Sequence, residues 1–517
     1  MERHRLALMG SVLRVTSLVA TTLVALFLMP FLVHRLGDKA YGYWTLIGAV
    51  LGYYGILDLG IGSAVQYQVA KALGDRNPDT ANRIISTAFH IFAAVGIFIF
   101  LSTVVLAAFA RTFITNNSDV HIFRAVLVTV GIGFALGFPG RAFVGALSAH
   151  LRLDLCAAVS ILVLIIRTTL IVVVIGRGGG IISLAVIALL TDILTYTCYY
   201  LLLRTVQANL RISPALASFH SVKELFHYSW YSLIIQLSDQ LRFSIDGWMV
   251  GIFVGVSAVT HYAIGSRLSQ AFMALLIAIL GILSPWFSQL WGSSDLDAIR
   301  RVFVLGTRAA ATISTIIACT LIFYGRPFIA VWMGTAYLDA YWPLVLLVSA
   351  IFIDVSQQPS VSYLYGVSRH RFLAFLTLAE AVANVGLSIF WARKYGLFGV
   401  ALGTLVPIAV AKVFIQPGYV CRHLQLSLKT YYLDLLGRSI VPTALSSFLL
   451  WVFVFRKLTS SNVVTICAMM VLQALMVAAV AFVFAFNKND KNMLLGKILP
   501  MLHLQRRTAL GESLEIN

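Results

Sequence analysis

The sequence predicts an all-α polytopic membrane protein with about fourteen transmembrane helices. Three observations support this fold class. Of the 517 residues, 60% are hydrophobic and only 11% are charged, whereas soluble domains carry about 25% charged residues. Long apolar runs recur along the whole chain. Finally, Lys and Arg gather on one side of these runs.

The apolar runs are long enough to cross a bilayer as helices. A hydrocarbon core of about 30 Å needs roughly 20 helical residues. Runs of this length without period-two alternation are helices rather than barrel strands, because backbone groups in lipid need partners within their own segment. The runs cover residues 11–34, 42–63, 86–110, 122–147, 153–176, 180–203, 228–253, 258–289, 302–325, 341–365, 372–392, 396–416, 438–455 and 463–486.

The positions of Lys and Arg predict the orientation. With an N-terminus inside, the inner connections hold 20, the outer connections 9 and the helices 9 of the 38 Lys and Arg residues. Cytoplasmic loops of membrane proteins are enriched in these residues. We therefore expect cytoplasmic N- and C-termini and an even number of crossings.

The longest inner connection predicts the domain division. Residues 205–227 are rich in serine and are expected to form a cytoplasmic linker. An N-terminal lobe of six helices is expected over 1–204, and a C-terminal lobe of six helices over 228–420. Two extra helices over 421–486 and a cytoplasmic tail over 487–517 would complete the chain.

A faint repeat supports the two lobes. Leu-Gly at 36–37 followed by Tyr43 is similar to Val-Gly at 254–255 followed by Tyr262. Paired halves of this kind place the substrate site of many transporters near the middle of the membrane.

Composition and motifs exclude several classes of function. The net charge of +18 is scattered among short connections, whereas nucleic-acid binding needs a clustered basic face. The five cysteines are widely separated, so no disulfide framework or zinc site is indicated. HExxH, GxSxG and Walker A motifs do not occur in the sequence. We expect no enzyme activity, no catalytic residues, no metal, no cofactor and no nucleic-acid partner.

Three charged residues share one face of the predicted helix 228–253. Asp239, Arg242 and Asp246 are spaced by three and four residues, which places them side by side on a helix. A charge near a helix centre costs about 2.5–3.5 kcal/mol on insertion, so such residues avoid lipid. Two interpretations stay open: a self-neutralising ion pair, or the polar wall of a central cavity.

Other charges within the predicted helices fall into two groups. Arg167 and Asp192 lie near the middle of two helices joined by a short turn, so we expect a structural ion pair between them. Arg14, Arg308 and Lys412 lie within about two turns of the inner surface, where a long side chain can extend to the headgroups. For these three, that interpretation and a role with substrate both stay open.

Four further charged residues have no evident partner in the sequence. Asp58, Arg267, Asp354 and Glu380 each lie within a different apolar run. Because an isolated charge avoids lipid, each is a candidate for the lining of a cavity.

Three stretches resemble a known family. Residues 34–46 (HRLGDKAYGYWTL) and 53–64 (YYGILDLGIGSA) resemble the opening of the polysaccharide transporter family, and residues 262–268 (YAIGSRL) are similar to its eighth helix. This family of O-antigen and capsule flippases belongs to the multidrug/oligosaccharidyl-lipid/polysaccharide exporter superfamily, together with multidrug extruders and lipid II flippases. The helix number agrees over the whole chain, although the sequence match is confined to these stretches.

The resemblance implies that the transmembrane helices form two pseudo-symmetric lobes around a central cavity. It also implies a flippase of the bacterial inner (plasma) membrane that works by alternating access. Its expected cargo is a polyprenyl-diphosphate-linked oligosaccharide for O-antigen, capsule or exopolysaccharide synthesis. Membrane lipids, a polysaccharide polymerase and a chain-length regulator are the other expected partners.

The resemblance also suggests site residues, because the first, second, seventh and eighth helices line the cavity in this family. Arg14, Arg242 and Arg267 are the expected substrate-binding residues, since the planar guanidinium can donate two hydrogen bonds to phosphate. Acids in the same helices and in later ones are expected to serve in proton or sodium coupling or in gating. These acids are Asp58, Asp239, Asp246, Asp354 and Glu380.

Two alternative functions stay open. A cation-coupled multidrug exporter of the same superfamily would use the acids to bind cationic drugs. A membrane-embedded polysaccharide polymerase or glycosyltransferase would usually carry its catalytic residues on a sizeable outer loop. The longest outer connections, 111–121 and 326–340, are only about a dozen residues each.

Overall fold

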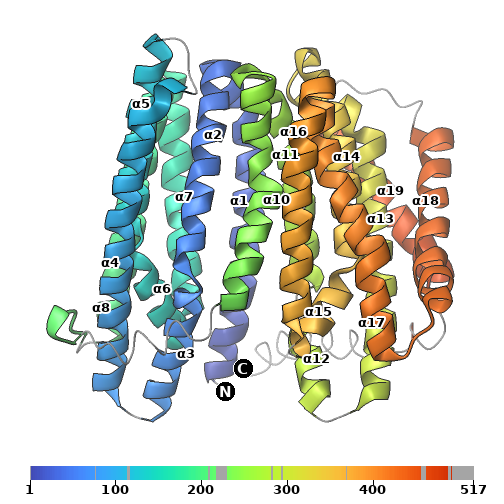
Figure 1. Cartoon of the computed structure of the whole chain (residues 1–517), viewed down its shortest axis with the longest axis horizontal. Coiled ribbons are helices and arrows are strands. Elements are labelled where there is room, and N and C mark those ends of the chain that lie inside the picture. Colours follow the sequence, from blue (N-terminus) through green and yellow to red (C-terminus); the bar gives the residue numbers. More distant parts are fainter. Residues whose placement is uncertain are drawn as a thin grey trace, which may run out of the picture. The chain divides into compact units, whose positions relative to one another are not determined.

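The regular elements of the protein are all helices in the part of the chain that the structure describes (Figure 1). The structure is a computed structural model that describes residues 2–75, 77–112, 117–207, 210–216, 230–280, 283–292, 295–367, 369–455, 462–486 and 491. Eleven helical stretches in it are long and apolar enough to cross a membrane. The predicted class, an all-α polytopic membrane protein, is confirmed.

The first half of the chain contains ten elements before residue 207 and one short turn after it. They are α1 (Glu2–Leu36), α2 (Asp38–Gly55), η1 (Ile56–Asp58), α3 (Ile61–Gly74), α4 (Pro78–Ala108), η2 (Phe109–Thr112), α5 (Asn117–Gly137), α6 (Gly140–Ala149), α7 (Leu153–Gly176), α8 (Ile181–Val206) and η3 (Pro214–Leu216). All six apolar runs predicted in this half lie on helices.

The second half continues in the same way. Its elements are α10 (Trp230–Phe253), α11 (Val256–Leu280), α12 (Leu283–Gly292), α13 (Leu296–Trp332), η4 (Thr335–Ala340), α14 (Tyr341–Ser356), α15 (Gln358–Gly366), α16 (His370–Ala409), η5 (Val410–Ile415), α17 (Gln416–Leu424), η6 (Thr430–Gly437), α18 (Arg438–Leu450), η7 (Trp451–Phe455) and α19 (Val463–Phe484). The segments η5, η6 and η7 are π-helical.

The eleven stretches and the fourteen predicted runs differ for two reasons. One stretch, Arg371–Leu424, is 54 residues long, roughly 80 Å as a helix, and Gly396 interrupts it with a positive φ of 56°. It therefore holds two of the predicted runs. In addition, the predicted runs 228–253 and 258–289 lie on α10, α11 and α12, which are not among the eleven stretches.

Contacts between residues divide the chain into two compact units. Unit 1 comprises Met1–Leu268 and Arg371–Pro407, and unit 2 comprises Ser269–His370 and Ile408–Asn517. Thus α10 and most of α16 belong with the N-terminal helices. The lobe boundaries at residues 204 and 420 stay predictions, and the expected tail lies outside the described residues, apart from residue 491.

Two membrane helices of unit 1 are broken. Between α2 and α3, Leu59 and Gly60 take left-handed φ values of 52° and 75°. Between α5 and α6, Phe138 and Pro139 interrupt the helix, because proline has no N–H to continue the hydrogen-bond pattern. The second halves of the two helices, α3 and α6, pack against each other.

The two halves of α16 form a tight antiparallel hairpin around Gly396. A Cβ atom on Gly399 would lie 2.2 Å from the carbonyl oxygen of Trp391, and one on Gly403 would lie 2.7 Å from the backbone of Ser388. Small residues at these positions let the two backbones touch. The hairpin places residues 371–395 and 397–407 side by side in unit 1.

Unit 2 is built around the long helix α13. This helix packs against α14, α18 and α19, and a small aromatic core of Tyr324, Phe323 and Trp451 joins it to the C-terminal helices. Its buried face is rich in hydroxyl groups. A polar face of this kind is expected to be buried among helices rather than turned to lipid.

Candidate functional site

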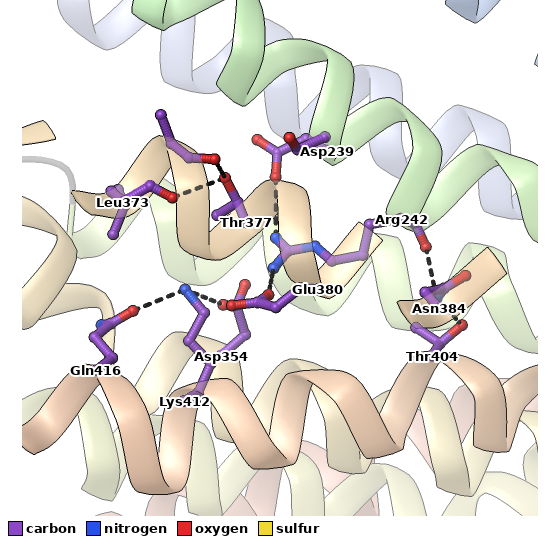
Figure 2. Close-up of polar contacts among 12 residues, drawn as sticks. Asp239, Arg242, Asp354, Leu373, Thr377, Glu380, Asn384, Thr404, Lys412 and Gln416 are labelled. Atoms are coloured by element: carbon purple, nitrogen blue, oxygen red, sulfur yellow. Dashed lines mark hydrogen bonds and ion pairs between the residues drawn. The ribbon is translucent and has the colours of Figure 1, made fainter. Parts of the chain in front are cut away.

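A buried ion cluster joins α10 to α16 in unit 1 (Figure 2). Arg242 donates from Nη1 to Oε2 of Glu380 at 2.6 Å and from Nη2 to Oδ1 of Asp239 at 3.0 Å. The side chain of Glu380 is 1% exposed, whereas that of Asp239 is 48% exposed. One guanidinium therefore links a buried and a half-exposed carboxylate.

One turn further along α10, Asp246 is surrounded by hydroxyl groups. Its Oδ2 accepts hydrogen bonds from Tyr262 at 2.6 Å and from Thr404 at 2.9 Å. Asn384 donates to Thr404 at 2.9 Å and to the carbonyl oxygen of Arg242 at 3.4 Å. Asp246 and Asn384 are buried, and neither Oδ1 of Asp246 nor the side-chain oxygen of Asn384 has a hydrogen-bond partner among the described residues.

The charged residues of α10 differ in the kind of partner that they contact. The guanidinium of Arg242 is occupied by carboxylates, which favours the ion-pair interpretation, and its role as a substrate contact stays a prediction. Asp246 forms no ion pair with any residue that the structure describes. A buried carboxylate without a counter-charge tends to bind a proton or a cation.

The two stretches that resemble the opening and the eighth helix of the transporter family meet in unit 1. Thr260 donates to the carbonyl oxygen of Asp38 at 2.6 Å, across 222 residues of sequence. Nearby, the exposed Arg267 lies beside the hydroxyl of buried Tyr41. The predicted substrate residue Arg267 is thus held near the start of α2. The side chain of Arg14 lies outside the described residues.

Asp58 has a partner that sequence reasoning missed. Arg141 donates from Nη1 to Oδ2 of Asp58 at 2.8 Å, and Gly62 donates its backbone N–H to Oδ1 at 3.0 Å. The guanidinium carbon of Arg141 lies 4.2 Å from the centre of the Phe138 ring. One sequence feature could have indicated this partner: Arg141 lies inside the apolar run 122–147, shortly after Pro139.

Arg167 and Asp192, expected as a structural pair, contact each other between α7 and α8. Arg167 also donates from Nε to the hydroxyl of Thr191 at 2.7 Å. The remaining contact of the guanidinium is a longer hydrogen bond of 3.5 Å to the carbonyl oxygen of Ala188. This arginine uses its donors within the pair of helices.

In unit 2, Asp354 pairs with Lys412 (Figure 2). Nζ of Lys412 lies 3.3 Å from Asp354 and 3.0 Å from Oε1 of Gln416, and the lysine is 2% exposed. Its ammonium group therefore does not extend to the headgroups, which corrects that interpretation of Lys412. Arg308 is likewise buried. Neither side chain is exposed at the surface of its helix.

Lys412 lies on the π-helical segment η5 of unit 2. It belongs to a longer series of hydrogen bonds. Gln416 donates to the carbonyl oxygen of Gln357 at 3.3 Å, and Tyr431 donates to Oε1 of Gln357 at 2.6 Å. Among the described residues, no group of three or more His, Cys, Asp and Glu is placed to hold a metal ion.

Several curated proteins are similar to this chain. It is 21% identical to a membrane protein of Bacillus subtilis named EpsK, over 79% of this chain and 81% of that protein. It is 21% identical to a putative O-antigen transporter of Shigella flexneri, over 76% and 93% of the two chains. It is 22% identical to a probable low-salt glycan biosynthesis flippase, Agl15, of Haloferax volcanii, over 74% and 77%.

Solved structures show the same fold. An inward-facing multidrug resistance MATE family transporter of the MOP superfamily matches with a TM-score of 0.70 at 14% identity, over 80% of this chain and 98% of that chain. A MOP superfamily transporter from Pyrococcus furiosus matches with a TM-score of 0.59 at 14% identity, over 82% and 96%.

The family is shown by the sequence itself. The model of the family described as polysaccharide biosynthesis protein matches residues 32–342. This match covers all three stretches that resemble polysaccharide transporters, as well as Asp58, Arg141 and the charged residues of α10. Because it extends over more than half of the 517 residues, this multi-pass membrane protein belongs to the polysaccharide biosynthesis protein family.

Proposed function

We propose that the protein is a flippase that moves a polyprenyl-diphosphate-linked oligosaccharide across the inner membrane by alternating access. The product would serve the synthesis of O-antigen, capsule or exopolysaccharide. The transporter fold and the names of the relatives support this function. The observation that carries it is the meeting of the family-like stretches in unit 1, which holds the exposed Arg267 beside Tyr41.

The chemistry of the cargo explains the need for Arg267. A diphosphate carries about two negative charges, and transferring them into a low-dielectric core without partners would be prohibitive. A guanidinium donates two parallel hydrogen bonds to phosphate and stays charged at any physiological pH. The polyprenyl tail needs no such help, because it stays among the lipid chains. We propose Arg267 as the leading head-group contact.

We propose Asp246 as the coupling acid. The other four candidate acids each contact a cation within their own unit. Asp58 contacts Arg141, Asp239 and Glu380 contact Arg242, and Asp354 contacts Lys412. Only hydroxyl groups donate to Asp246 among the described side chains. Its unpartnered Oδ1 can accept a proton, and both this oxygen and Oδ1 of Asn384 can coordinate a small cation, because hard cations prefer oxygen ligands.

Transport of a fluorescent polyprenyl-diphosphate disaccharide in proteoliposomes tests this function. The wild-type protein should flip the probe, Arg267→Ala should reduce the rate at least tenfold, and Asp246→Asn should abolish the response to an imposed proton or sodium gradient. Arg177→Ala, which changes a residue in the α7–α8 turn, is the matched control. Full activity of Arg267→Ala would remove this site assignment.

A deletion strain separates the flippase from a drug exporter. Loss of surface polysaccharide with unchanged drug sensitivity supports the proposal. Drug sensitivity with intact polysaccharide would instead select the multidrug exporter. Glycosyl transfer by the purified protein from a nucleotide sugar would select the enzyme alternative.

We also propose that both termini are cytoplasmic, because Lys and Arg are in excess on the inner side. Fusions of a fluorescent protein and of alkaline phosphatase to the C-terminus test this orientation. Fluorescence without phosphatase activity is expected. A polymerase and a chain-length regulator are the proposed functional partners, since a flipped repeat unit must be joined to others on the far side of the membrane.

A further inference from the structure

We propose that Arg141 is a second contact for the diphosphate of the cargo, in addition to Arg267. This inference rests on the proposed flippase function. It assigns an anion-binding role to a residue that the sequence did not single out. Asp58 would act as the counter-ion of Arg141 while no cargo is bound.

Arg141 lies where the two broken helices of unit 1 meet. It is the second residue of α6, and its partner Asp58 is the last residue of η1, just before α3. The ion pair therefore joins the two breaks, and α3 packs against α6 beyond it. The breaks lie about 15–20 Å from the far ends of α6 and α3. Both breaks fall inside helical stretches that are long and apolar enough to cross a membrane, Asp38–Gly74 and Asp119–Ala149, and broken helices mark the binding sites of many transporters.

The guanidinium of Arg141 is held in place but is mostly unused. Its one hydrogen bond to a described residue runs from Nη1 to Asp58, although a guanidinium carries five N–H donors. Its flat face stacks on Phe138, with the guanidinium carbon 4.2 Å from the ring centre. The side chain is 27% exposed. A charged group within the membrane that keeps this exposure is expected to face water or a polar ligand rather than lipid.

Three other arginines of the membrane helices use more of their N–H donors than Arg141 does, or are buried. Arg167 has contacts from Nε and Nη2 to three neighbouring groups. Arg242 is buried between two carboxylates. Arg124 uses Nε and Nη2 on two backbone carbonyl groups. Arg141 alone in this comparison keeps its Nε and Nη2 edge available, and this edge matches two phosphate oxygens.

Asp58 allows a prediction that a purely structural ion pair would not: neutralising Asp58 and neutralising Arg141 should change anion binding in opposite directions. Its Oδ1 is already held by the N–H of Gly62, so the carboxylate stays next to the guanidinium when an anion arrives. Two negative groups would then share one cation, and the carboxylate would weaken anion binding. Removing the charge of Asp58 should therefore strengthen binding, whereas removing the charge of Arg141 should weaken it.

Binding to the full-length protein in phosphatidylcholine nanodiscs tests the inference. The probe is farnesyl diphosphate, and farnesol, which lacks the anion, is the comparison ligand. We expect Arg141→Gln to raise the Kd for the diphosphate at least tenfold, Arg141→Lys to raise it several-fold, and Asp58→Asn to lower it several-fold. Binding of farnesol should not change. Arg167→Gln is the matched control and should leave the Kd for the diphosphate unchanged.

The outcomes are distinguishable. Equal affinities of Arg141→Gln and wild type would overturn the inference, as would an Asp58→Asn variant that loses binding to the same extent as Arg141→Gln. The double variant Arg141→Gln with Asp58→Asn controls for a folding defect, because it leaves neither charge without its partner. It should bind the diphosphate as weakly as Arg141→Gln. Failure of the wild-type protein to prefer the diphosphate over farnesol would overturn the proposed function as well.

Discussion

The ion cluster of α10 and α16 predicts the order in which three substitutions destabilise the protein. Arg242 contacts Glu380, whose side chain is 1% exposed, and Asp239, whose side chain is 48% exposed. Each of the three residues can be neutralised by an amide of similar size. The variants Arg242→Gln, Glu380→Gln and Asp239→Asn leave different charges buried, so their costs should differ.

The magnitudes follow from what each variant leaves behind. Arg242→Gln removes the arginine that contacts the buried Glu380, and breaking a buried pair in this way costs about 3–5 kcal/mol. Glu380→Gln leaves Arg242 paired with Asp239 and keeps an acceptor for Nη1, so the cost should be about 1.5–3 kcal/mol, as for a hydrogen bond to a charged group. Asp239→Asn removes a half-exposed pair, which contributes about 0–1 kcal/mol.

Thermal unfolding of the purified variants in detergent measures this order. The midpoint should fall most for Arg242→Gln, less for Glu380→Gln and least for Asp239→Asn. The double variant Arg242→Gln and Glu380→Gln should lose less than the sum of its single variants, because both substitutions remove the same contact. Additive losses, or a loss for Asp239→Asn as large as that for Glu380→Gln, would refute the reasoning.

Three further predictions concern unit 1. Gly42→Ala should destabilise the protein by about 1–3 kcal/mol in the same unfolding assay, because its Cβ would lie 2.3 Å from a carbonyl oxygen of α11. Gly48→Ala in the same helix is the control: its Cβ would meet nothing within 4 Å, so this variant should be neutral or slightly stabilising. Gly396→Ala should lower the amount of folded protein on size-exclusion chromatography, since φ 56° and ψ −132° are strained for alanine by about 1–3 kcal/mol. Burial, aided by the charge of Arg152, lowers the pKa of His150, so the folded state disfavours the imidazolium. Stability should be full above about pH 6.5 and should fall as the pH drops through the lowered pKa, and His150→Gln should remove this fall in unfolding midpoints measured between pH 5 and 8.

The sequence was sufficient to predict the helices but not their breaks. A long apolar run has few alternatives to a helix in lipid, so all fourteen predicted runs lie on helices. The interruptions at Gly60 and Pro139 fall inside two of these runs. The pattern of apolar residues does not reveal these interruptions, because a broken helix buries the same side chains as a continuous one. Proline and glycine were the available signals.

The charged residues were recognised individually, whereas their partners were not. Asp58 and Arg141 are separated by 83 residues, and Arg242 and Glu380 by 138 residues. A spacing rule detects partners only within one helix or across a short turn, which is why the contact of Arg167 with Asp192 could be anticipated. The distant pairs depend on how helices pack, and a single sequence does not specify that.

The hairpin at Gly396 has a consequence for how the nascent chain enters the bilayer. Arg242 leaves the ribosome 138 residues before Glu380, an interval of roughly 7–28 seconds at normal elongation rates. During that time Asp239, one turn away on the same helix, is its nearby carboxylate. Because the two arms of α16 are joined at Gly396 without a loop, we expect them to enter the bilayer together as one hairpin. Their late insertion would then give Arg242 its second carboxylate contact, long after α10 was synthesised.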